Sequence, residues 1–128
     1  KACVFVDDCL GDKTTALDNL ASRYRHSNIH LLMISTQLFR KVSPTIRANA
    51  TNILIGRLQN ARELDKLDEE YGGMYDNKFI ELYKKATKKK YDFLHLNLQE
   101  NPAEAWINFE TKIYPTSETE IEENEDEE

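Results

Sequence analysis

Two adjacent carboxylates, Asp7 and Asp8, directly follow an apolar, β-prone run at residues 2–6. Like charges at the end of a buried strand repel each other, so such a pair is favoured where a partner offsets the repulsion. A divalent cation such as Mg²⁺ would do so, and the second carboxylate could then activate water for attack on a phosphoryl group. The alternative interpretation is the polar end of an ordinary strand.

A small polar cluster, Ser35-Thr36-Gln37, ends the next apolar run at residues 29–35 (IHLLMIS). Open α/β sheets place ligand sites at the carboxyl ends of their strands, so the cluster and the acids suit one site. A Gln there can hydrogen-bond a γ-phosphate or orient a water molecule. A strand ending in two acids is also the Walker B pattern of phosphate-loop NTPases.

A receiver domain is the other α/β fold that carries an acidic pair after its first strand. It also needs a phosphoacceptor Asp at the end of a later strand. The strands expected at residues 29–35 and 51–56 continue into Thr36 and Arg57, not into Asp. The sequence therefore excludes a receiver domain.

Strand-like and helix-like segments alternate along the chain, which favours an α/β layer fold. The run at 29–35 is almost continuously apolar, as expected of a central strand buried on both faces. Residues 105–109 are expected to pair with residues 91–97 as a hairpin. The remaining expected elements are strands at 2–6 and 51–56, helices at 13–24, 61–71 and 76–86, and a helical turn at 45–49.

Four stretches, in order and suitably spaced from residue 2 to about residue 71, resemble motifs of the genome-packaging ATPases of large DNA viruses. These poxvirus-type enzymes belong to the FtsK–HerA superfamily of P-loop NTPases. The stretches are VFVDDCLGD, RHSNIHLLMISTQ, PTIRANATNILIGR and ARELDKLDEEYG, and YDFLHLN with AWINF fits the last strands more loosely. The resemblance implies that residues 1–114 are the C-terminal half of that ATPase, from Walker B onward. The implied fold is an incomplete RecA-like core, a mostly parallel sheet with flanking helices.

Carried over to this sequence, the resemblance makes Asp7 the Walker B acid that holds Mg²⁺ through water. Asp8 becomes the water-activating acid, where many relatives have Glu. Gln37 corresponds to the sensor that contacts the γ-phosphate, so it counts as both catalytic and nucleotide-binding. The implied cofactors are ATP and Mg²⁺.

Three arginines are candidates for an arginine finger. Arg25 lies where the superfamily tends to carry an Arg before its sensor strand, and Arg47 falls in a motif shared by the viral branch. Either could reach a phosphate in its own subunit or in a neighbouring one. Arg57 follows a strand and is a third candidate. Surface ion pairs are the alternative for each of them.

No G-x-x-x-x-G-K-[ST] loop occurs among the 128 residues, which contain four glycines. Such a loop supplies the backbone N–H cradle and the Lys that hold the phosphates. In the family it lies N-terminal to Walker B, so we expect this chain to be a fragment that does not hydrolyse ATP by itself. A split or degenerate protein would also lack the loop.

The resemblance implies ATP-driven movement of double-stranded DNA into a capsid by a homo-oligomeric ring that meets a capsid vertex protein. Two alternatives stay open: another FtsK–HerA-type DNA translocase, and a non-catalytic interaction module with a degenerate NTPase-like fold. Cys3 and Cys9 make no disulfide framework, which favours a reducing, intracellular location. The resemblance implies that this location is the virion or the host-cell cytoplasm. No signal peptide and no membrane-spanning apolar run is visible.

The net charge of −6 is unevenly distributed. Residues 115–128 carry eight of the 23 acidic residues and no Lys or Arg, so 15 acids face 17 basic residues elsewhere, a net charge of +2. An acidic, disordered tail is therefore expected at 115–128. Five lysines gather at residues 84–90, at an expected helix end. They suit either the helix macrodipole or contact with a DNA backbone.

Overall fold

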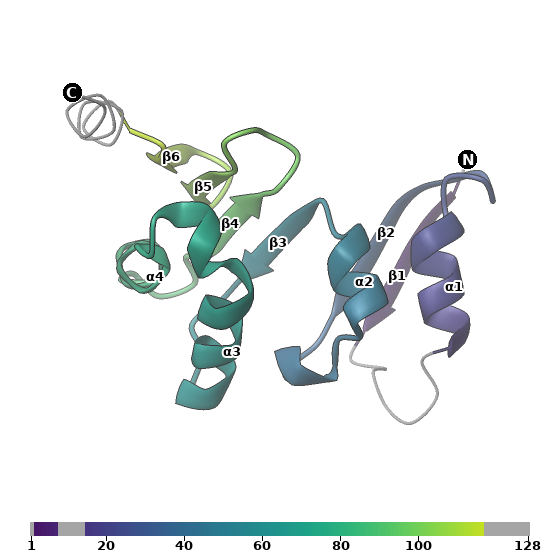
Figure 1. Ribbon diagram of the computed structural model, residues 1–128, viewed down its shortest axis with the longest axis horizontal. Helices are drawn as coiled ribbons and strands as arrows, with labels where there is room; N and C mark the ends of the chain where they lie inside the picture. The colour runs from purple at the N-terminus through teal and green to yellow at the C-terminus, as the bar shows by residue number, and fades with distance from the viewer. Residues whose placement is uncertain (1, 8–14, 117–128) are drawn as a thin grey trace. The chain divides into compact units, whose positions relative to one another are not determined.

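The computed structural model describes residues 2–7 and 15–116. It is a mixed α/β structure with a two-stranded and a four-stranded sheet (Figure 1). The chain divides into two compact units, Lys1–Ala50 and Thr51–Glu128, called the first and second units below. Asp8, Cys9 and the acidic tail from residue 117 onward lie outside the described residues.

The first unit is built on two parallel strands joined through a helix. Strand β1 pairs with β2 so that Ala2 lies opposite Ile29 and Asp7 lies opposite Ser35. Helices α1 and α2 cover one face of this sheet, where Ala21 is buried (Figure 1). The elements are β1 (Ala2–Asp7), α1 (Thr15–Arg23), β2 (Ile29–Ser35), the 3-10 helix η1 (Phe39–Lys41) and α2 (Pro44–Asn49).

Ser43 explains where α2 begins. Its hydroxyl accepts a hydrogen bond from the Ile46 amide at 3.2 Å, and Pro44 occupies the first helical turn, where its missing N–H costs nothing. The same hydroxyl donates to Oδ1 of Asp18 on α1 at 2.6 Å. One serine thus caps α2 and ties it to α1.

The second unit packs helix α4 on one face of an antiparallel meander, and helix α3 packs on α4. The strands follow in the order β3-β4-β5-β6, and β4 and β5 form the hairpin predicted from the sequence. Leu94, Leu96 and Ala105 alternate onto the buried face, and Phe79 on α4 is also fully buried. The elements are β3 (Asn52–Ile55), α3 (Ala61–Tyr71), η2 (Gly72–Tyr75), α4 (Phe79–Ala86), β4 (Leu94–Asn97), β5 (Glu104–Ile107) and β6 (Thr111–Tyr114).

The prediction of an α/β fold is confirmed, but the prediction of a mostly parallel sheet is wrong. Only β1 and β2 run parallel among the described strands, whereas β3 pairs with β4 in the opposite direction. The physical reason is that two helices, α3 and α4, separate β3 from β4. A single crossover helix carries the chain back to the end where the first strand began, so the next strand runs parallel to it. A pair of helices returns the chain to the end where the first strand finished, so the next strand runs antiparallel.

The sheet of the first unit also has an uncovered apolar face, contrary to the prediction that residues 29–35 are buried on both faces. Leu32 and Ile34 pack toward the helices. On the other face Leu31 and Met33 are 48% and 43% exposed, and Phe5, opposite Met33, is 61% exposed. The uncovered apolar face consists of the side chains of Phe5, Leu31 and Met33.

Candidate functional site

The carboxyl ends of β1 and β2 bring two of the predicted polar residues into contact. Because the strands are parallel, Asp7 and Ser35 are register partners at the same edge. The Ser35 hydroxyl donates to Oδ1 of Asp7 at 2.5 Å, a charge-assisted hydrogen bond. Asp7 is exposed, so its carboxylate faces solvent at the edge where open α/β sheets hold ligands.

Thr36 and Gln37 directly follow Ser35, where the chain leaves β2. The Leu38 amide donates to Oγ1 of Thr36 at 3.1 Å, which turns the chain as it leaves β2. Gln37 lies within this turn and is exposed. The three residues of the polar cluster therefore have different roles. Ser35 contacts Asp7, Thr36 stabilises the turn, and Gln37 is exposed to solvent.

The oxygen groups at this edge suit Mg²⁺ chemically. Magnesium prefers hard oxygen ligands, keeps several waters and takes one or two carboxylates. Asp7 supplies a carboxylate, the Ser35 hydroxyl lies at the end of the neighbouring strand, and Gln37 lies in the turn that follows it. Within residues 2–7 and 15–116, no three His, Cys, Asp or Glu side chains form a cluster that could hold a metal ion. Water and phosphate would therefore have to complete such a site.

A cradle for the phosphates of ATP is not found in the described residues. Such a cradle needs a glycine-rich loop that opens a helix. Gly56 follows β3, and Gly72 and Gly73 follow the carboxyl end of α3. The residues present therefore fit a cation better than a nucleoside triphosphate, and no hydrolytic step follows from them.

Arg47 lies one turn into α2 and contacts the loop that follows Gln37. Its guanidinium carbon is 4.6 Å from the centroid of the Phe39 ring, a cation–π contact. The side chain is half-buried. The contact places the Arg47 guanidinium beside η1, the first helical turn after β2.

Arg25 lies at the opposite end of the parallel strands. It donates from Nε to the Tyr24 hydroxyl at 3.2 Å, and the Tyr24 carbonyl accepts from the Ile29 amide at the start of β2. At about 3.3 Å per residue, the strand separates this end from Ser35 by roughly 20 Å. The structure does not bring Arg25 and Asp7 together within one chain.

Arg57 holds the end of a helix in the second unit. Its Nη2 donates to the carbonyls of Thr87 and Lys88 at 2.7 and 2.9 Å, and its Nε donates to Thr87 at 3.2 Å. These contacts join the residue that follows β3 to the carboxyl end of α4. In this structure Arg57 is a positioning residue for α4.

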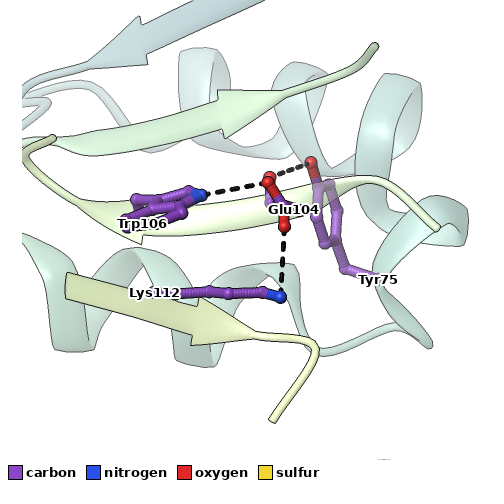
Figure 2. A network of polar contacts seen from close by, with 4 residues as sticks. All are labelled: Tyr75, Glu104, Trp106 and Lys112. Carbon is purple, nitrogen blue, oxygen red and sulfur yellow. Dashed lines mark hydrogen bonds and ion pairs between the residues drawn. The ribbon is translucent and has the colours of Figure 1, made fainter. Parts of the chain in front are cut away.

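A polar network on β5 and β6 had not been singled out from the sequence (Figure 2). Lys112 pairs with Glu104 at 3.1 Å, Trp106 donates to the same carboxylate at 3.4 Å, and the buried Tyr75 hydroxyl donates to the Glu104 carbonyl at 3.0 Å. The hydrogen bond from Lys112 is the main cause that lowers the pKa of Glu104, while burial raises the pKa of Tyr75. Glu104 is thus ionised and Tyr75 neutral around neutral pH.

His95, on β4 beside Trp106, is held by the Asn52 side chain, with 2.9 Å between His95 Nε2 and Asn52 Oδ1. Burial lowers the pKa of His95, and the nearby Glu104 charge only partly opposes this. The ring is therefore neutral at physiological pH. These polar contacts between strands indicate a structural role.

Comparison with protein-family models, with curated proteins and with solved structures finds no match. Within residues 2–7 and 15–116, none of the helices has the length and apolar character needed to cross a membrane. A functional proposal therefore depends on the site geometry and on the motif resemblance.

Proposed function

We propose that this chain is the C-terminal part of an ATP-driven translocase that packages double-stranded DNA into a viral capsid. The observation that carries the proposal is the contact between Asp7 and Ser35 at the carboxyl edge of two parallel strands, with Gln37 exposed in the next turn. A Walker B strand beside a sensor strand needs this arrangement. The order of the motifs along the chain agrees with it.

In this proposal Asp7 holds the water shell of Mg²⁺, and Ser35 orients its carboxylate. When bound with ATP, the metal would neutralise developing charge on the phosphates. Asp8 would position the attacking water, and Gln37 would contact the γ-phosphate. The chain's own part is to keep these groups on one edge.

The uncovered apolar face of the first unit supports a larger, RecA-like core. Parallel sheets normally have both faces covered. Here Phe5, Leu31 and Met33 leave one face exposed. Further elements of a complete core would bury these side chains.

In a homo-oligomeric ring that binds ATP between subunits, the two arginines would have different roles. Arg47 lies near the loop that leaves the Asp7 edge and would act within its own subunit. Arg25 lies at the far end of the strands, so a finger role would require the active edge of a neighbouring subunit. The ring would work with a capsid vertex protein, in the virion or the host-cell cytoplasm.

The test begins with the coding sequence on the N-terminal side of residue 1. We expect a strand followed by G-x-x-x-x-G-K-[ST], and the protein that contains both parts should hydrolyse ATP. Asp8→Asn should abolish hydrolysis and retain nucleotide binding. Asp65→Asn, an equivalent change at an exposed position on α3, is the matched control and should leave the rate unchanged. A reading frame without such a loop would rule out the ATPase.

A non-catalytic interaction module is the second candidate. In that case the exposed side chains of Phe5, Leu31 and Met33 would contact a partner protein and not further elements of an ATPase core. It predicts no hydrolysis in the whole protein and no effect of Asp8→Asn. A third candidate, another FtsK–HerA-type DNA translocase, would hydrolyse ATP without binding a capsid vertex protein.

A further inference from the structure

Five exposed lysines surround the carboxyl end of α4 in the second unit. Lys84 and Lys85 lie in the last helical turn. No described residue forms an ion pair with any of the five. The other three, directly after the helix, are Lys88, Lys89 and Lys90.

These lysines are not the groups that satisfy the end of the helix. Arg57 already occupies the carbonyls of Thr87 and Lys88 with three hydrogen bonds. The Thr87 hydroxyl in turn donates to the Tyr83 carbonyl at 2.8 Å. A helix end already held by Arg57 does not require five more cations, so their charge is available to an anionic partner.

An exposed tyrosine follows the lysines immediately. Tyr91 is 87% exposed, and the Lys90 ammonium lies 5.1 Å from the centre of its ring. Its φ of 72° is in the left-handed region, which is unfavourable for a bulky side chain. A folded protein gains no stability from exposing an aromatic ring on strained backbone, and such positions are frequent at ligand sites.

A second exposed ring belongs to the neighbouring turn. Phe109 is 65% exposed and meets the Phe93 ring edge-on at 5.2 Å. The backbone amide of Asn108 donates to the Phe93 carbonyl at 2.9 Å, and Oδ1 of Asn108 accepts from the Phe93 backbone amide at 3.0 Å. Its side chain also donates to Asp92 at 3.1 Å. These contacts hold the turn that carries Phe109 against residues 92 and 93, directly after Tyr91.

We propose that this surface, called the lysine–tyrosine site, binds single-stranded nucleic acid. The lysines would contact backbone phosphates, and the rings of Tyr91 and Phe109 would stack on unpaired bases. A duplex keeps its bases stacked inside, so it could use the lysines but not the rings. The site goes beyond the proposed packaging function and does not depend on it, because it requires neither ATP nor Mg²⁺.

The test is fluorescence anisotropy of the full chain with a labelled oligothymidylate of about 16 nucleotides, without nucleotide or metal. The single strand should bind more tightly than a duplex of equal length. Tyr91→Asn should weaken single-strand binding by about tenfold and leave duplex binding unchanged. Asparagine tolerates the left-handed region, so this variant should melt no earlier than the parent.

Two double-lysine variants distinguish binding at this site from a general effect of positive charge. Lys88→Ala with Lys89→Ala should weaken binding and reduce the slope of log K against log salt by about 1.4. The matched control removes the same charge elsewhere, with Lys41→Ala and Lys66→Ala, and should bind like the parent. Lys41 lies on η1 and Lys66 on α3.

Several outcomes would overturn the proposal. Equal affinity for single strand and duplex, unchanged by Tyr91→Asn, would reveal attraction between charges only. An equal loss in the control would show that no particular site exists. Binding to phosphatidylserine vesicles in place of the oligonucleotide would assign the lysines to a membrane surface. Absence of oligonucleotide binding at low salt would also reject the site, whether or not the whole protein hydrolyses ATP.

Discussion

Replacing Arg57 with methionine removes the three hydrogen bonds that hold the carboxyl end of α4. The donors are Nη2, at 2.7 Å from the Thr87 carbonyl and 2.9 Å from the Lys88 carbonyl, and Nε, at 3.2 Å from Thr87. Methionine keeps an aliphatic stem of similar length. The change therefore isolates the guanidinium.

The expected loss follows from the geometry. A hydrogen bond with one charged partner contributes about 1.5–3 kcal/mol. Two of the three bonds share the Thr87 oxygen, and the bond to Lys88 is exposed to water. We therefore count the set as about one full bond, a loss of about 2 kcal/mol in the free energy of unfolding of the second unit.

Urea unfolding followed by fluorescence measures this loss, because Trp106 is the only tryptophan in the chain and lies on β5 in the second unit. Arg57→Lys is the control. Its single ammonium keeps the charge but lacks the fork that spans two carbonyls, so it should recover less than half of the loss. A methionine variant within about 0.5 kcal/mol of the parent would refute the assignment, since ordinary surface changes fall in that range. Complete recovery by lysine would show that charge alone matters.

Three further predictions concern other contacts. Ser43→Ala should destabilise the first unit by about 1–2 kcal/mol. Combined with Asp18→Asn, it should reduce the free energy of unfolding by less than the sum of the two single changes, which a double-mutant cycle followed by circular dichroism would measure. Tyr75→Phe should cost about 1 kcal/mol in the same fluorescence assay, because it removes a buried donor but keeps the ring; an unchanged midpoint would contradict this. Since Lys112 lowers the pKa of Glu104, the ionised carboxylate stabilises the fold above its ordinary value of 4.5, and this stabilisation is lost as the pH falls through the lowered pKa. Lys112→Met should therefore reduce stability at neutral pH and change little in strong acid, and an equal difference at both pH values would argue against the pair.

The local elements could largely be predicted from the sequence. The strand Ile29–Ser35 and the helix Ala61–Tyr71 have the predicted bounds, because a continuous apolar run and a 3.6-residue period are strong signals. The helix expected at 76–86 begins later, at Phe79, because Asp76 and Asn77 take positive φ. Strand β6 (Thr111–Tyr114) was not among the elements predicted from the sequence.

The pairing of strands could not be predicted from the same information. The run TNILIG indicates a strand but not the direction of its partner. Direction also depends on how the intervening helices α3 and α4 pack and on the end of the sheet at which the chain re-enters, and a helical period encodes neither. The antiparallel sheet therefore had to come from the structure.

The candidate site shows a similar limit. The sequence indicated that polar groups end the first two strands, but not that Asp7 faces Ser35. That register depends on an irregularity beside Ala2 and Cys3, where β2 contains one extra residue. Without it Asp7 would lie opposite Ile34, because a one-residue slip exchanges every neighbour. Apolar patterning does not encode such a bulge.

Tyr91 was assigned to a strand from its apolar neighbours, whereas the strand begins at Leu94. The lysines before it were the available signal, because a tyrosine after three consecutive lysines is poorly suited to the start of a buried strand. By contrast, the nearby aromatic residues Tyr71, Tyr75 and Phe79 are buried and serve packing.

The buried side chains are unequally distributed between the two units. Among the described residues, the buried apolar side chains of the first unit are Ala21 and Ile46, and all the others belong to the second unit. Amide hydrogens in β1 and β2 should therefore exchange with solvent before those in β4 and β5, because few buried contacts resist local opening. The edge that carries Asp7 and Ser35 thus belongs to the segment that opens most readily. A ligand held at that edge would be detected first as slower exchange in β1 and β2, while exchange in the second unit stays the same.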